Sequence, residues 1–159
     1  MRLKSTLFLK IALILIGIPI LALGIFGLFD LYKYPLNLNN HELILCPIII
    51  GIYVTGIPFY FALYQTFKLL CYIDKSNAFS ELSVKALKNI KYCAISISIF
   101  YTTILPVCMS YSQKHDFPGL VIMATFSSFT SAVIAVFAAV LQKLLREAID
   151  IKSENDLTV

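Results

Sequence analysis

The sequence predicts an all-α integral membrane protein, a four-transmembrane-helix bundle with cytoplasmic helical extensions. Three observations support this fold class. Only 14% of the 159 residues are charged and 59% are apolar, whereas soluble domains carry roughly 25% charged residues. Four long stretches contain no Asp, Glu, Lys, Arg or His, and the number of positive residues alternates between the segments that separate them. A soluble chain of this composition would lack the polar surface needed to cover its core.

The four charge-free stretches define the predicted spans. They cover residues 11–29, 43–67, 92–113 and 117–142, and are 19, 25, 22 and 26 residues long. About 20 residues suffice for a helix to cross a hydrocarbon core about 30 Å thick, because its backbone satisfies its own hydrogen bonds. We therefore predict a single membrane domain over residues 1–159, with a cytoplasmic loop over 68–91 and a cytoplasmic tail over 143–159.

The distribution of Lys and Arg predicts the orientation. The five segments outside the spans hold 3, 1, 5, 1 and 3 of these residues in chain order. Positive residues in short flanking segments stay on the cytoplasmic side. Eleven of the thirteen therefore lie inside if both termini face the cytoplasm. Topology and contact with anionic headgroups explain the net charge of +4, so no direct nucleic-acid binding is predicted.

The first span leaves one processing alternative open. Three basic residues precede an apolar run that contains Ala22-Leu23-Gly24, as in a signal peptide with a small-residue cleavage site. The run continues to Phe29, which favours a complete span. Cleavage would leave three helices with the same loop orientations.

Hydroxyl residues are abundant in the third and fourth spans, whereas no span contains an ionisable side chain. The absence of charge argues against a proton-coupled carrier. The hydroxyls would either line a permeation path or lie where neighbouring helices pack closely. Small and hydroxyl residues are typical of helix contacts in lipid, which favours packing. Two series have helix-packing spacing: Ser96, Thr103 and Ser110 in the third span, and Ala124, Ser128, Ser131, Ala135 and Ala138 in the fourth.

Residues that form disulfides or bind metals are scattered. The four cysteines occur singly, which favours free buried thiols, although Cys46 and Cys108 lie towards the outer ends of their spans and would permit a disulfide. His41-Glu42 and His115-Asp116 occupy the two outer loops and would form a metal or pH-sensing site if they met. Their spacing matches no ligand motif, so we interpret them as solvated loop residues and predict no metal.

The cytoplasmic loop contains an amphipathic pattern. Asn77 is predicted as the N-cap of a helix that runs into the third span. Lysines occupy the rest of its circumference. The apolar residues at helical spacing are Phe79, Leu82, Ala86, Leu87 and Ile90.

The tail continues the fourth helix to Ser153 along the stripe Leu141, Leu144 or Leu145, Ala148 and Ile151, and the last six residues are predicted to be extended or frayed. Five basic residues in the loop complement four acidic ones in the tail, so we expect the two segments to pack on each other at the membrane surface. The alternative is that they bind a protein partner. The candidate partner-binding residues are Phe79, Leu82, Lys85, Lys88, Glu154, Asp156 and Leu157.

Two runs of the sequence resemble a known family: FALYQTFKLLCYIDKSNAFSELSVKALKNIKYC and AVLQKLLREAIDIKSENDLTV. Both are similar to the YoaS-type family of small bacterial membrane proteins, a domain of unknown function (family 2975). The resemblance is most specific at Asn77-Ala78-Phe79-Ser80 and Glu154-Asn155-Asp156-Leu157. It implies four helices in the bacterial cell (inner) membrane, and no catalytic residue. Family members are often accompanied by a small helix-turn-helix regulator, which implies a partner for the loop and tail.

No catalytic motif or phosphate-binding loop is recognisable, so we predict neither an enzyme nor a cofactor. The main hypothesis is an uncharacterised multi-pass membrane protein that acts as a regulatory or interaction component. One alternative is a small oligomeric exporter or permeation protein, and another is an accessory subunit of a different membrane protein. The expected partners are the lipid bilayer, a cytoplasmic regulatory protein and, in a homo-oligomer, a second copy of the chain.

Overall fold

The computed structural model describes residues 2–33, 45–75 and 78–157. Four α-helices account for nearly all of them: α1 (Arg2–Lys33), α2 (Leu45–Asp74), α3 (Glu81–His115) and α4 (Gly119–Leu157). They contain 32, 30, 35 and 39 residues, and each is long and apolar enough to cross a membrane. The predicted all-α fold with four spans is confirmed.

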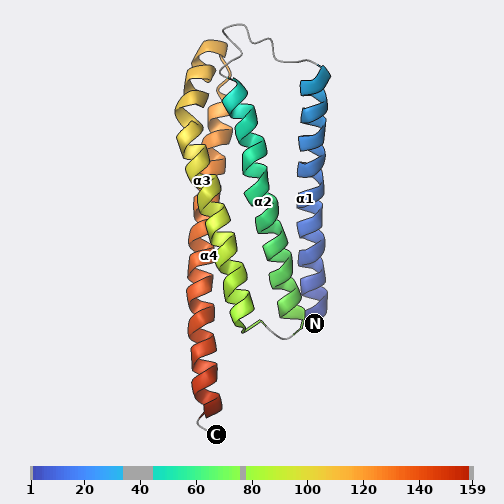
Figure 1. Cartoon of the computed structure of the whole chain (residues 1–159), viewed down its shortest axis with the longest axis vertical. Helices are drawn as coiled ribbons and strands as arrows, with labels where there is room; N and C mark the ends of the chain where they lie inside the picture. The colour runs from blue at the N-terminus through green and yellow to red at the C-terminus, as the bar shows by residue number, and fades with distance from the viewer. Residues whose placement is uncertain (1, 34–44, 76–77, 158–159) are drawn as a thin grey trace.

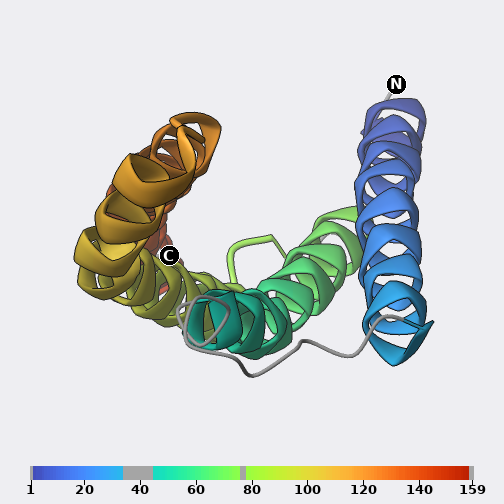
Figure 2. The same cartoon turned by 90° about the horizontal axis from the view of Figure 1, so that it is seen from above.

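The helices stand side by side in chain order and form an open arc (Figures 1 and 2). α1 packs on α2, α2 on α3, and α3 on α4, and within the described residues no other pair of helices is in contact. The bundle is therefore open, with α1 and α4 at its two edges. Both termini lie at the lower end of Figure 1, which we call the terminal end, and the turn between α3 and α4 lies at the opposite end.

Most of the predicted loop over 68–91 is helical. α2 continues to Asp74 and α3 begins at Glu81. Ser80 is the N-cap of α3: its backbone is extended (φ −138°, ψ 153°), and its hydroxyl accepts a hydrogen bond from the Ser83 N–H at 3.4 Å. Asn77, the predicted N-cap, lies outside the described residues. The helix begins later than expected because Ser80 supplies the capping oxygen and Glu81 places an acidic group in the first turn.

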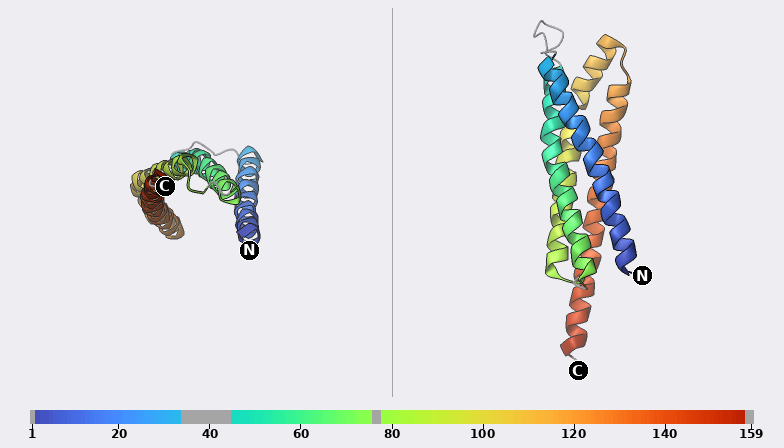
Figure 3. Two further views of the ribbon diagram at one scale, coloured as in Figure 1. Left: turned by 90° about the horizontal axis from the view of Figure 1, so that it is seen from below. Right: turned by 90° about the vertical axis from the view of Figure 1, so that its right-hand side faces the viewer.

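The tail is helical to Leu157, so the predicted extended end beyond Ser153 is wrong for residues 154–157. The apolar stripe stops, but the backbone continues because the last two turns contain no Gly or Pro to break the helix. The Ser153 hydroxyl donates to the Asp150 carbonyl at 2.8 Å, within the helix. As a result, α4 extends past the ends of the other helices at the terminal end (Figure 3).

The core lies between α2, α3 and α4 near the opposite end. Its buried residues are Ile48, Ile104, Cys108 and Ala124. Gly51 permits the close approach of α2 to α3, because a Cβ at that position would lie 2.6 Å from the Phe100 ring. In contrast, α1 contributes no residue to this core.

Candidate functional site

The start of α3 presents an exposed surface at the terminal end, which we call the α3-start surface: Phe79, Leu82, Lys85 and Lys88. Phe79 and Leu82 are 58% and 55% exposed, and both lysines are exposed. Ala86 and Leu87, predicted on the same apolar face, are buried instead. The predicted stripe is split because Phe79 precedes the helix, whereas Leu82 lies in its first turn, away from the packed side.

The tail residues do not join this surface. Glu154, Asp156 and Leu157 are exposed on the last turn of α4, and Leu157 is 86% exposed. Counting 17 residues along the two antiparallel helices from the Ser98–Ser128 hydrogen bonds puts Glu81 about level with Leu145. At 1.5 Å per residue, the last turn of α4 therefore lies about 14–18 Å beyond the start of α3.

The expected packing of a basic loop on an acidic tail is not formed by ion pairs. In the described part of the chain, the ion pairs join Lys10 to Asp74 and Lys143 to Glu147. The second pair, at 3.9 Å, lies within α4 at i,i+4 spacing, and both side chains are largely exposed. The predicted charge complementarity between loop and tail therefore does not appear as an ion pair between the α3-start surface and the tail among the described residues.

A polar contact joins α1 to α2 at the terminal end. The Lys10 ammonium donates to the Asp74 carboxylate, which also accepts a hydrogen bond from the Thr6 hydroxyl. The Lys10 and Asp74 side chains are only 23% and 18% exposed. The hydrogen bond from Lys10, followed by that from Thr6, lowers the pKa of Asp74 below its ordinary value. The same hydrogen bond raises the pKa of Lys10.

Sequence reasoning missed this contact because its partners are 64 residues apart. A signal was present: Lys10 directly precedes the first predicted span, and Asp74 follows the second. Antiparallel helices bring those two ends together. The second predicted span ends at residue 67, two helical turns before Asp74. Because α2 was expected to end there, the sequence did not place Asp74 level with Lys10.

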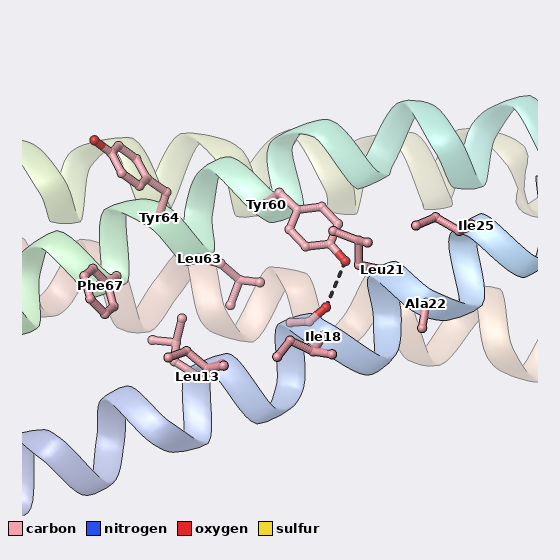
Figure 4. A pocket seen from close by; sticks show the side chains of 11 residues that line it. Leu13, Ile18, Leu21, Ala22, Ile25, Tyr60, Leu63, Tyr64 and Phe67 are labelled. Carbon is pink, nitrogen blue, oxygen red and sulfur yellow. Dashed lines mark hydrogen bonds between the residues drawn. The ribbon is translucent and has the colours of Figure 1, made fainter.

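An apolar groove of about 520 Å³ lies between α1 and α2 (Figure 4). Tyr60, which lines the groove, donates its hydroxyl to the Gly17 carbonyl at 3.1 Å. Seven residues earlier in α2, the Tyr53 hydroxyl donates to the Gly24 carbonyl at 3.0 Å. The two tyrosines are seven residues apart in α2, and the two glycines are seven residues apart in α1. Seven residues are two helical turns, so both hydrogen bonds lie on the same face of each helix. The residues that line the groove include Leu13, Ile18, Leu21, Leu63 and Phe67.

The small-residue series predicted in α4 lies at its contact with α3. Ala124, Ala135 and Ala138 are buried, and Ser128 and Ser131 are half-buried. Ser98 and Ser128 are joined reciprocally, each hydroxyl donating to the other residue's carbonyl at 3.1 and 3.3 Å. This part of the packing prediction is confirmed.

The series predicted in α3 is not part of that contact. Ser96, Thr103 and Ser110 are exposed, and each hydroxyl donates to the carbonyl four residues earlier in its own helix, at 2.8–3.0 Å. Heptad spacing alone could not reveal which face of α3 meets α4. Because these hydroxyls are used within their own helix, they offer little polarity to a permeating solute.

The four cysteines are free thiols, so the Cys46–Cys108 disulfide is not formed. His41-Glu42 lies outside the described residues. His115 stacks on Tyr111 with 4.4 Å between ring centroids, and Asp116 ends α3 in the left-handed conformation (φ 50°, ψ 40°). Among the residues that the structure describes, no three His, Cys, Asp or Glu side chains cluster as a metal site would require.

Comparison with known proteins supports the membrane assignment. The chain is 61% identical over its full length to the uncharacterised membrane protein YoaS of Bacillus subtilis (strain 168), and the match also covers all of that protein. No solved structure matches the chain. Residues 8–159 match the family described as protein of unknown function (DUF2975). The sequence, the four spans and this match together show that the chain is a membrane protein of the DUF2975 family.

Proposed function

We propose that this protein is a non-enzymatic regulatory or interaction component of the bacterial cell membrane, with both termini in the cytoplasm and a soluble protein partner at its α3-start surface. The observation that carries the proposal is the exposure of Phe79 and Leu82 beside Lys85 and Lys88. All four lie outside the predicted spans, on the side that the positive residues assign to the cytoplasm.

This surface fits a protein partner that has an apolar contact area surrounded by acidic residues. A large aromatic and a large aliphatic side chain gain free energy when a partner removes them from water. The neighbouring ammonium groups favour an acidic rim around the partner's apolar contact, and such charges mainly raise the association rate. A small helix-turn-helix regulator is the candidate partner that the family resemblance suggests. Its acidic face, rather than a DNA-binding face, would contact the membrane protein.

The test is photo-crosslinking from position 82 in intact cells. The matched control is position 117, because Phe117 is 55% exposed at the opposite end of α3 and also has an exposed lysine, Lys114, nearby. We expect a soluble protein to be crosslinked from position 82 and not from 117. Lys85→Glu combined with Lys88→Glu should reduce the yield, whereas Lys114→Glu should leave it unchanged.

Equal crosslinking from both positions contradicts the proposal. So does a crosslinking yield from position 82 that stays the same when Lys85 and Lys88 are both replaced by Glu. A product that contains only lipid also contradicts it. A C-terminal green fluorescent protein fusion checks the orientation separately, because this fusion fluoresces when the tail is cytoplasmic and a C-terminal alkaline phosphatase fusion is active when the tail is outside.

A second candidate is an accessory subunit of another membrane protein. The open arc favours it, because among the described helices α1 contacts α2 alone and leaves most of its apolar surface exposed. Crosslinking from Leu23, which is 72% exposed on α1, separates the two candidates. An integral protein recovered from position 23 supports the subunit role, whereas a soluble protein recovered from position 82 supports the regulatory role.

A further inference from the structure

The tail of α4 projects as a single helix. By residue count from the Ser98–Ser128 bonds, Glu81, the first residue of α3, is about level with Leu145, so residues 146–157 extend beyond it. Figures 1 and 3 show this segment continuing straight along the axis of α4 instead of bending back towards the other helices. An isolated helix of such length is marginal in water, so a neighbour would stabilise it.

An apolar stripe follows α4 from the membrane into this projection. Its positions alternate in steps of four and three residues, which is the a/d pattern of a coiled coil. Leu144 and Ile151, near the tail, are 55% and 67% exposed. Only Ala148 is half-buried, and the other positions are exposed. The stripe consists of Thr130, Ile134, Phe137, Leu141, Leu144, Ala148 and Ile151.

The stripe is separate from the contact with α3. Ala138, which is buried, and the half-buried Leu145 and Ile149 lie on the α3-facing side of α4. At 100° per residue, the stripe is centred about 90° away from that side. A second helix can therefore pack on the stripe without displacing α3.

The charges that flank the stripe complement each other in a parallel pair of identical helices. With Leu144 and Ile151 at d positions, Glu147 occupies g and Lys152 occupies the following e. These are the two positions that meet across a parallel two-stranded coiled coil, at a separation of five residues. Two copies inserted in one membrane with the same orientation necessarily present their tails in parallel.

We propose that the stripe on α4 is the interface for a second copy of this chain, with the projecting tails forming a parallel two-stranded coiled coil. Two symmetric pairs, Glu147 with Lys152 of the second copy and the reverse, fix the register. The Ile151 side chains pack against each other, and the outward-facing Ser153 does not take part. This interface is independent of the partner proposed for the α3-start surface.

Cysteine crosslinking in native membranes tests the interface on the full chain. Ile151→Cys should give a disulfide-linked dimer on mild oxidation, and Ser153→Cys, two residues away on the outer side, should not. The unsubstituted chain reports any background from the four native cysteines. In the Ile151→Cys chain, Glu147→Lys or Lys152→Glu alone should lower the dimer yield about threefold, and the two together should restore it.

Equal yields at positions 151 and 153, the absence of a dimer at 151, or a double reversal that fails to restore the yield overturns the proposal. A disulfide from position 151 to a different protein does so as well, because it identifies another occupant. Crosslinking from position 82 in the Glu147→Lys chain keeps the two proposals distinguishable. If the crosslink from position 82 is retained, the partner binds without the dimer. If that crosslink is lost while the dimer still forms, the result contradicts the partner proposal and leaves the dimer proposal intact.

Discussion

The α3–α4 pair and the α1–α2 pair are both antiparallel apolar helices, but they are held together differently. α4 buries Ala124, Ala135 and Ala138 against its neighbour, whereas among the described side chains of α1 only Thr6 is buried. α1 is attached through tyrosine hydroxyls and an ion pair, beside a groove of about 520 Å³. Apolar composition therefore drives insertion into the bilayer, and small residues decide how closely the inserted helices pack.

Overpacking the α3–α4 contact should have the largest effect. Ala135→Leu adds volume to a position that is 7% exposed and should destabilise the protein by about 2–3 kcal/mol. Unfolding in a detergent–SDS titration, followed by far-UV circular dichroism, measures the change. Val136→Leu is the matched control, since Val136 is 64% exposed and should tolerate the larger side chain. Equal losses in the two variants would show that α4 does not pack on α3 through this face.

Removing the tyrosine hydroxyls should weaken the α1–α2 pair. Tyr53→Phe and Tyr60→Phe each remove one hydrogen bond from α2 to a carbonyl of α1 and should each cost about 1 kcal/mol. The control is Tyr64→Phe. The ring of Tyr64 lies 4.8 Å from the Lys68 ammonium, and phenylalanine retains that contact. Amide hydrogen exchange should accelerate in α1 and stay unchanged in α4. Faster exchange throughout the chain would contradict the separation of the two pairs.

The serine pair should contribute less than the packing around it. Ser128→Ala removes a hydroxyl that contacts both the Ser98 carbonyl and the Thr102 hydroxyl of α3, and should cost about 0.6 kcal/mol, since alanine preserves the close approach. Ser131→Ala is the control because its hydroxyl bonds only to the Ser127 carbonyl within α4. A double-mutant cycle with Thr102→Ala isolates the coupling between the Ser128 and Thr102 hydroxyls, which lie 2.7 Å apart. A cost for Ser128→Ala equal to that of Ala135→Leu would show that hydroxyls, not small volumes, hold the pair together.

The smallest change in overall stability is expected from Asp74→Asn, because its ion pair lies at the end of the helices and is partly exposed. The effect should be local and should appear as faster hydrogen exchange near residues 6–14. The Asp74 pKa is lowered in the folded protein, so the stabilising contribution is present above its ordinary pKa and is lost as the pH falls through the lowered value.

The raised pKa of Lys10 gives the opposite limit at high pH. Its contribution is complete below the ordinary lysine pKa and is lost as the pH rises through the raised value. The exchange rate of the wild-type segment relative to the Asp74→Asn variant should therefore be constant between about pH 5 and pH 9. A change near neutral pH would point to a different titrating group.

The sequence was a good guide to features that depend on local composition. Charge-free runs located all four spans, and the spacing from Ala124 to Ala138 identified the packed face of α4. Spacing failed for Ser96, Thr103 and Ser110, because a heptad describes a face of a helix and does not say what covers it. The same limit applied to Leu82, which has helical spacing but lies outside the packed side of α3.

Contacts between distant segments were beyond the reach of that analysis. Lys10 meets Asp74 only because α2 extends past its predicted span and runs antiparallel to α1. The end of α4 was misjudged for a related reason: the loss of an apolar stripe shows where burial stops, and α4 remains helical beyond that point, to Leu157. The candidate residues named from the sequence lie on two separate surfaces, which the sequence could not show.

Proline distinguishes α4 from the other helices. α1, α2 and α3 contain Pro19, Pro58 and Pro106, each of which removes a backbone hydrogen bond and creates a point of bending. No proline interrupts the 39 residues of α4. In the proposed topology, α4 is thus a stiff rod that runs through the bilayer into the aqueous phase. A tilt of its membrane-embedded half, such as a change in bilayer thickness would produce, moves the tail tip in the opposite direction with the leverage of the projecting length.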